Sequence, residues 1–106
     1  MQYDLIISVI KTARENNSLY WKDHILQRMR QRKISVSDIL TVLNDFSIIK
    51  EYKVDKPFPS YLLVGFADKK PIHIVVGVNE IDFEIHLITA YIPDDLIWED
   101  NYRRRK

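Results

Sequence analysis

The sequence contains no cysteine, and only two glycines occur among its 106 residues. Without cysteine the chain can form neither a disulfide framework nor a thiolate metal site, which fits a reducing cytoplasm. Two isolated glycines exclude a glycine-rich phosphate loop, and neither a Walker motif nor a dinucleotide-binding fingerprint is present. The N-terminus lacks the leading positive charge and long apolar run of a signal peptide or membrane span. We therefore expect a cytoplasmic protein that does not associate with membranes.

The charge of the chain is small in total but unevenly distributed. Apolar residues make up 46% and charged residues 29%, values typical of one soluble globular domain covering residues 1–106. The net charge is +1, with basic residues in excess in 1–33 and 103–106 and acidic residues in excess in 34–102. This pattern suits phosphate at one surface and a basic partner at another. A disordered basic tail at 103–106 is the alternative.

Hydrophobic spacing predicts helices in the first part of the chain. Apolar residues recur at helical intervals in residues 3–15, within 23–33 and in 36–44. Asn16 and Asn17 are expected to end the first helix, and Asp23 to cap the second. Ser35 and Asp38 have the spacing of a capping box and open the third.

The second half of the chain has the pattern of a β-sheet. Runs rich in β-branched and aromatic residues occur at 47–53, 61–67, 72–78 and 83–92. Short connections between them imply an antiparallel meander. The remaining residues, 94–106, form a polar tail that Trp98 and Tyr102 could anchor. The expected fold is α+β, with N-terminal helices followed by a twisted antiparallel four-stranded sheet.

One face of the predicted second helix combines histidine and arginine. His24 and Arg28 are i, i+4 neighbours, and Arg32 continues the same side one turn later. Ile25, Leu26 and Met29 lie on the other side, where they can enter a core. The helix thus offers either a phosphate-binding face or an ordinary solvated basic face.

The strands contribute further polar candidates. His73 alternates with flanking isoleucines, so it points away from them and is either hydrogen-bonded inside the fold or lines a site. Thr89 and Tyr91 share a predicted face with the apolar positions of the last strand. The hydroxyl of Tyr91 could donate a proton or bind phosphate, or the ring could simply pack in the core. His86 is expected to be a solvated strand residue.

These residue types suggest cleavage of RNA without a metal or cofactor. No histidine is paired at a recognised metal-ligand spacing. RNA supplies an internal 2′-hydroxyl nucleophile, so the protein needs a base, an acid and cations. Candidate catalytic residues are His24, His73 and Tyr91. Candidate RNA- or phosphate-binding residues are Arg28, Arg32, Lys53, Lys56, Thr89 and Arg103 to Arg105.

A longer pattern resembles a known family. It comprises His24, Arg28-Met29, Arg32, Ile34-Ser35, Asp38 to Leu40, Ile48 to Tyr52, Pro57 to Ser60, Leu63, Gly65, Pro71 to Val75, Thr89 to Asp94 and Trp98. Between about residues 20 and 100 the chain resembles a bacterial family of unknown-function domains in the RelE/ParE-like toxin superfamily, similar in style to MqsR toxins. Residues 1–16 lie largely outside the resemblance.

The resemblance implies a RelE/ParE-like α+β fold and a role as the toxin of a type II toxin–antitoxin pair. Its partners would be a cognate antitoxin, in relatives often of a zinc-finger type, and RNA that is free or ribosome-bound. Better-known members cleave mRNA without metal, which makes an endoribonuclease the leading hypothesis. ParE-like members act on DNA gyrase, so the alternative is a non-catalytic binding module: a gyrase-directed toxin or an inactive relative that only pairs with its antitoxin.

Overall fold

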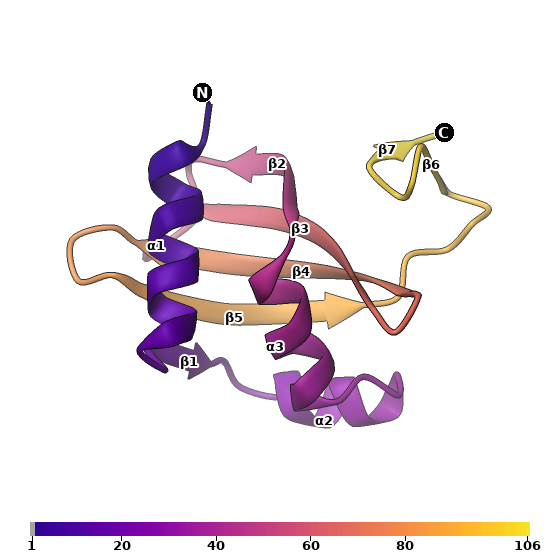
Figure 1. Cartoon of the computed structure of the whole chain (residues 1–106), viewed down its shortest axis with the longest axis horizontal. Helices are drawn as coiled ribbons and strands as arrows, with labels where there is room; N and C mark the ends of the chain where they lie inside the picture. Colours follow the sequence, from indigo (N-terminus) through magenta and orange to yellow (C-terminus); the bar gives the residue numbers. More distant parts are fainter. Residues whose placement is uncertain (1) are drawn as a thin grey trace.

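The computed structural model describes residues 2–106, and its helices lie against one main sheet (Figure 1). The helices are α1 (Asp4–Glu15), α2 (Ile25–Gln31) and α3 (Val36–Asn44). The strands are β1 (Leu19–Trp21), β2 (Ser47–Tyr52), β3 (Ser60–Ala67), β4 (Lys70–Asn79), β5 (Glu84–Tyr91), β6 (Trp98–Glu99) and β7 (Arg104–Arg105). Across these described residues, no helix has both the length and the apolar character needed to cross a membrane.

The main sheet is mixed and has five strands in the order β1-β5-β4-β3-β2. Strands β2 to β5 form the predicted antiparallel meander, whereas β1 pairs in parallel with β5, with Tyr20 opposite His86. The prediction of a four-stranded antiparallel sheet is therefore wrong in strand number and at one edge. Strand β1 has only three residues, too few for a recognisable alternation, and its partner lies far along the chain.

Helices α1 and α3 cross one face of the sheet and form the core with it (Figure 1). The fully buried strand residues Ile72, Ile74 and Val76 alternate toward these helices. The helices contribute the buried residues Ile6, Val9, Ile10, Ala13, Ile39, Val42 and Leu43. We call the opposite side of the sheet, which carries His73, the outer face.

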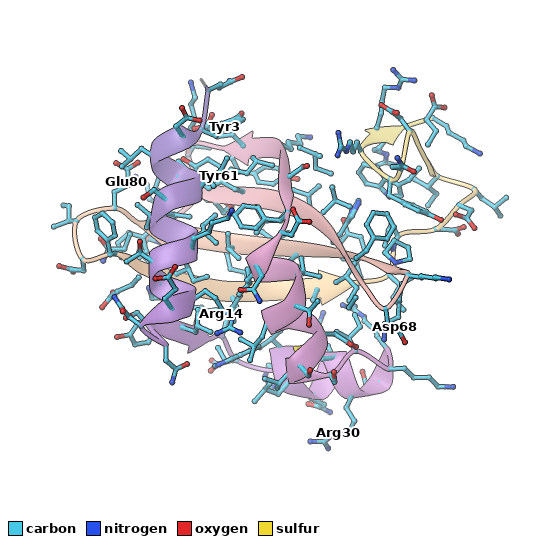
Figure 2. The ribbon with its side chains drawn as sticks, viewed as in Figure 1. Tyr3, Arg14, Arg30, Tyr61, Asp68 and Glu80 are labelled. Carbon is cyan, nitrogen blue, oxygen red and sulfur yellow. The ribbon has the colours of Figure 1, made fainter. Side chains whose placement is uncertain are left out.

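Besides its buried core residues, α1 makes side-chain contacts near both ends, at Tyr3 and at Arg14 (Figure 2). The ring of Tyr3 meets that of Tyr61 edge to face, with centroids 6.0 Å apart. Farther along the helix, the Nε of Arg14 donates to the carbonyl oxygen of Leu40 at 3.3 Å, which joins α1 to α3. Arg30, by contrast, is exposed on α2 and extends away from the sheet (Figure 2).

Several local sequence signals act as predicted. The hydroxyl of Ser35 accepts from the backbone N–H of Asp38, and the Asp38 carboxylate accepts from the backbone N–H of Ser35, both at 3.0 Å. Asn17, just after α1, has a φ of 56°, in the left-handed region that asparagine tolerates. Asp68 and Lys69 also have positive φ and form the two-residue connection between β3 and β4.

The predicted polar tail folds into a short hairpin of β6 and β7 (Figure 1). Trp98 and Tyr102 act as its anchors, as expected. The Trp98 ring meets His73 edge to face at 4.5 Å between centroids, and the Tyr102 ring lies 6.2 Å from that of Phe66. An ion pair between Arg104 and Glu99, at 2.7 Å, joins the two strands of the hairpin. The C-terminal segment therefore covers part of the outer face.

Candidate active site

A buried histidine and a half-buried tyrosine form the centre of the candidate site. His73 has no exposed surface, and its Nδ1 lies 3.1 Å from the hydroxyl of Tyr91. Its Nε2 lies 2.7 Å from the carbonyl oxygen of Tyr102. A carbonyl can only accept, so Nε2 carries the proton of the ring. In the neutral ring Nδ1 is then an acceptor, and the Tyr91 hydroxyl donates to it.

A β-bulge brings Tyr91 to this side of the sheet. The register between β4 and β5 shifts between Val75 and Val76, which leaves Ile88 without a partner on β4. After the bulge Thr89 lies opposite Val75, and Tyr91 lies opposite His73. The predicted face of Thr89 and Tyr91 is therefore wrong, because one extra residue in a strand reverses the alternation beyond it.

Tyr91 lines a pocket between the sheet and the C-terminal hairpin. We call it the tyrosine pocket; its volume is about 310 Å³. Its lining residues are Ile49, Lys50, Tyr52, Leu62, Tyr91, Trp98, Arg103, Arg104 and Arg105. Aromatic rings and cations therefore surround it together, the combination that proteins use to hold bases and phosphates of single-stranded nucleic acid.

Burial sets the protonation of the central pair. Desolvation lowers the pKa of His73, while the hydrogen bond to the Tyr102 carbonyl acts in the opposite direction. Desolvation raises the pKa of Tyr91; Tyr52 adds to this increase and the charge of Arg105 opposes it. At neutral pH the pair is therefore a neutral imidazole and a protonated phenol. A phenolate formed at Tyr91 would be stabilised by Arg105.

The arginines of the pocket differ in their availability. Arg104 is paired with Glu99, so part of its charge is already neutralised. The guanidinium carbon of Arg105 lies 5.9 Å from the centroid of the Trp98 ring, a cation–π distance. Arg103 lines both this pocket and a smaller one beside Gly65. The predicted pair Arg103 and Arg104 thus lies at the tyrosine pocket, but Arg104 is the less available cation.

Lys50 and Tyr52 also line the tyrosine pocket, although neither is among the predicted site residues. Both lie on β2, where Lys50 pairs with Leu62 and Tyr52 with Ser60 on the outer face. The Nζ of Lys50 lies 5.4 Å from the centroid of the Tyr52 ring. Lys50 and Tyr52 are two positions apart, so the sequence already places them on the same face of a strand. A second bulge, between Ile48 and Lys50, determines which face they occupy.

His24 and Arg28 lie in a different place from the central pair. They line an exposed depression on α2 together with Gln27, Gln31 and Arg32. His24 is itself the N-cap of α2, with a φ of 67° and no side-chain cap hydrogen bond, so the prediction that Asp23 caps this helix is wrong. Within residues 2–106 no hydrogen bond joins His24 to His73 or Tyr91. Tyr91, bonded to the buried His73, thus lines one pocket, whereas His24 and Arg28 line another.

Arg32 connects the helix to the strand that carries Tyr91. Its guanidinium donates to the carbonyl oxygen of Ala90 at 2.8 Å and to the Thr89 hydroxyl at 3.4 Å. Strand β1 ends opposite Leu87, so the Ala90 carbonyl lies where this edge of β5 has no neighbouring strand. Arg32 satisfies that acceptor, a structural role in addition to any contact with phosphate.

The remaining predicted residues lie around the loop after β2. Lys53 is exposed in this loop, and Lys56 lines a pocket beside His86. His86 is not the solvated residue that the strand pattern suggested. Its ring is partly buried, with centroids 5.2 Å from Tyr20 and 5.1 Å from Phe58. The short strand β1 and the loop cover it, and neither contact is local in sequence.

A protein-family model matches most of the chain. The family described as "Domain of unknown function (DUF4258)" matches residues 21–92. The chain belongs to this family. The DUF4258 segment contains His24, Arg28, His73 and Tyr91, whereas α1 and the C-terminal hairpin lie outside it. Comparisons with curated proteins and with solved structures give no match.

Proposed function

We propose that this DUF4258 protein is a metal-independent endoribonuclease that cleaves mRNA. The observation that carries the proposal is the Tyr91 hydroxyl, which donates to a buried neutral His73 beside a pocket of aromatic and basic side chains. As in the resembling toxins, its cellular role would be that of a type II toxin neutralised by a cognate antitoxin.

The Tyr91–His73 pair can move one proton in each direction. The ribose 2′-oxygen attacks phosphorus while its proton passes to the Tyr91 oxygen and the Tyr91 proton passes to Nδ1 of His73. The imidazolium that forms keeps its Nε2–H on the carbonyl of Tyr102. The reverse transfer returns a proton to the departing 5′-oxygen. The products are a 2′,3′-cyclic phosphate and a 5′-hydroxyl, and DNA is not cleaved because it lacks the nucleophile.

Cations around the pocket would stabilise the phosphate as its negative charge grows. Arg103, Arg105 and Lys50 all line the pocket that contains Tyr91. In a partly desolvated pocket such cations contribute more than they would in open water. His24 and Arg28, in their separate depression, would contact the RNA backbone farther along the strand rather than the scissile bond.

Removing a single hydroxyl group tests the proposal. Tyr91→Phe should lower the rate of RNA cleavage by about 100-fold or more, because a positioned acid–base group contributes that much. Tyr61→Phe removes a hydroxyl from the core side of the same sheet and serves as the matched control. The assay follows cleavage of a labelled RNA by the purified protein and identifies the cyclic phosphate end. Growth arrest on expression with intact RNA would refute the enzymatic proposal.

One observation favours a second candidate, a binding module without catalysis. Both ring nitrogens of His73 are satisfied within the protein and the side chain is fully buried, as in a purely structural histidine. The protein would then inhibit DNA gyrase or only pair with its antitoxin, with acidic tail residues such as Asp94 and Asp95 holding a basic segment. Inhibition of gyrase in a DNA supercoiling assay would support the gyrase-directed role. Growth arrest that persists in Tyr91→Phe would support a non-catalytic role.

A further inference from the structure

A second pocket lies on the outer face of the sheet, beside the loop that follows β2. We call it the proline-loop pocket; its volume is about 250 Å³. Its lining residues are Lys22, Asp55, Lys56, Pro57, Phe58, Gly77, His86 and Ile88. A Cβ placed on Gly77 would lie 3.7 Å from His86 Cβ and from Ile88 Cδ1. The pocket is therefore hollow partly because its sheet position carries no side chain.

The rings of Phe58 and His86 form one wall of this pocket, and Tyr20, which does not line it, packs on His86. Phe58 lies over His86 at 5.1 Å with an interplanar angle of 37°, and Tyr20 stacks on His86 at 5.2 Å and 22°. Phe58 is only partly buried, and Tyr20 remains 48% exposed. The Nε2 of His86 is buried without a hydrogen-bond partner in residues 2–106, an uncommon state for a polar atom beside a cavity. The wall has the composition of a base-stacking surface.

The charges at the rim are mostly positive. Lys22 and Lys56 line the pocket, and no ion pair involves either of them in the part of the chain that the structure describes. The carboxylate of Asp55 accepts a hydrogen bond from Ser60. Its negative charge disfavours phosphate in that corner but not a neutral base. The pocket thus suits a base inside and a phosphate at its lysine rim.

The two pockets share one surface. Tyr52, Ser60, Gly77 and His86 are successive partners across β2, β3, β4 and β5, so one row of the outer face runs from the tyrosine pocket to the proline-loop pocket. Along β5, His86 and Tyr91 are five positions apart, which corresponds to roughly 16 Å. Single-strand binding sites in proteins cover about four nucleotides at the short end. A bound strand of about that length is of the size needed to reach both pockets.

We propose that the proline-loop pocket binds a second nucleobase of the RNA strand whose scissile phosphate lies at Tyr91. The inference rests on the proposed ribonuclease function and extends it. The substrate is single-stranded RNA several nucleotides long, held at two separated base sites on the outer face. Phe58 provides the stacking surface, and Lys22 and Lys56 hold the adjacent phosphate.

Binding of uncleavable oligonucleotides of two lengths tests this inference. We would measure fluorescence anisotropy with labelled 2′-O-methyl oligouridines of two and six nucleotides. Phe58→Leu keeps apolar volume but loses the aromatic face. It should weaken binding of the six-nucleotide probe about fivefold or more, because stacking contributes at least that much per base. The two-nucleotide probe is too short to reach both pockets and should bind at the more strongly cationic tyrosine pocket, so its affinity should change less than twofold. Phe58→Tyr keeps an aromatic ring and should bind the six-nucleotide probe with about the wild-type affinity.

Phe83→Leu is the matched control, because Phe83 is 37% exposed in the turn between β4 and β5 and lines neither pocket. Equal weakening of both probes by Phe58→Leu, or no weakening of either, would overturn the inference. Cleavage of unmodified RNA is measured in parallel. A protein that cleaves RNA without this length-dependent loss refutes only the second base site. A protein that shows the loss but cleaves no RNA refutes only the catalytic proposal.

Discussion

Adding one methyl group at Gly65 should destabilise the protein by crowding α3 against β3. A Cβ at this position would lie 2.7 Å from Val42 Cγ1 and 3.0 Å from the carbonyl oxygen of Asp45. Val42 is fully buried, and its branched side chain has one favoured rotamer in a helix, so it cannot turn aside. The backbone oxygen moves only with the end of α3. The contact must therefore be relieved by displacing the helix.

Overpacking of this kind costs about 1 to 3 kcal/mol, so Gly65→Ala should lower the free energy of unfolding by that amount. At about 4 to 8 °C per kcal/mol, the melting temperature should fall by several degrees or more. Urea unfolding and thermal melts followed by circular dichroism measure both quantities. Gly77→Ala is the control, because its Cβ would make ordinary 3.7 Å contacts, and we expect little change.

A double substitution at Gly65 and Val42 tests whether their close contact causes the loss of stability. If the 2.7 Å contact causes the loss, Val42→Ala should remove much of the effect, so the two substitutions should be non-additive by about 1 kcal/mol. Equal stabilities for Gly65→Ala and Gly77→Ala would refute the reasoning, as would additive losses in the double variant.

Two further predictions concern the site and its support. Burial lowers the pKa of His73 below its ordinary 6.5, so the folded protein binds fewer protons than the unfolded chain. The stabilisation from this group is fully present above about pH 6.5 and should decline as the pH falls below that value. Urea unfolding at about pH 7.5 and 5.5 should therefore show a larger loss of unfolding free energy in wild type than in His73→Gln. Equal losses in the two proteins would contradict this origin. Arg32→Ala should cost about 1 kcal/mol, because the carbonyl of Ala90 loses its charged donor, whereas Arg28→Ala on the exposed side of α2 should change stability by less than about 0.5 kcal/mol in the same titration.

Part of the candidate site was predictable from residue types alone. His73 alternates with isoleucines that enter the core, which is why the sequence places it on the opposite face. The cations Arg103 and Arg104 were identified by composition, and both line the pocket of Tyr91. The pairing of Tyr91 with His73 was not predictable, because the bulge at Ile88 depends on how β5 aligns with β4. Strand alternation by itself assigns Tyr91 to the wrong face.

The sequence by itself determined the local elements of this protein. Helical periodicity, the capping box at Ser35 and the short turn at Asp68 and Lys69 act over a few residues, so their physical causes are visible in the sequence. The separation of His24 from His73 was decided by tertiary structure, as were the parallel pairing of β1 with β5 and the closure of the C-terminal hairpin over His73. Each depends on contacts between segments far apart in the chain. Their geometry is determined only when sheet register and packing are satisfied together.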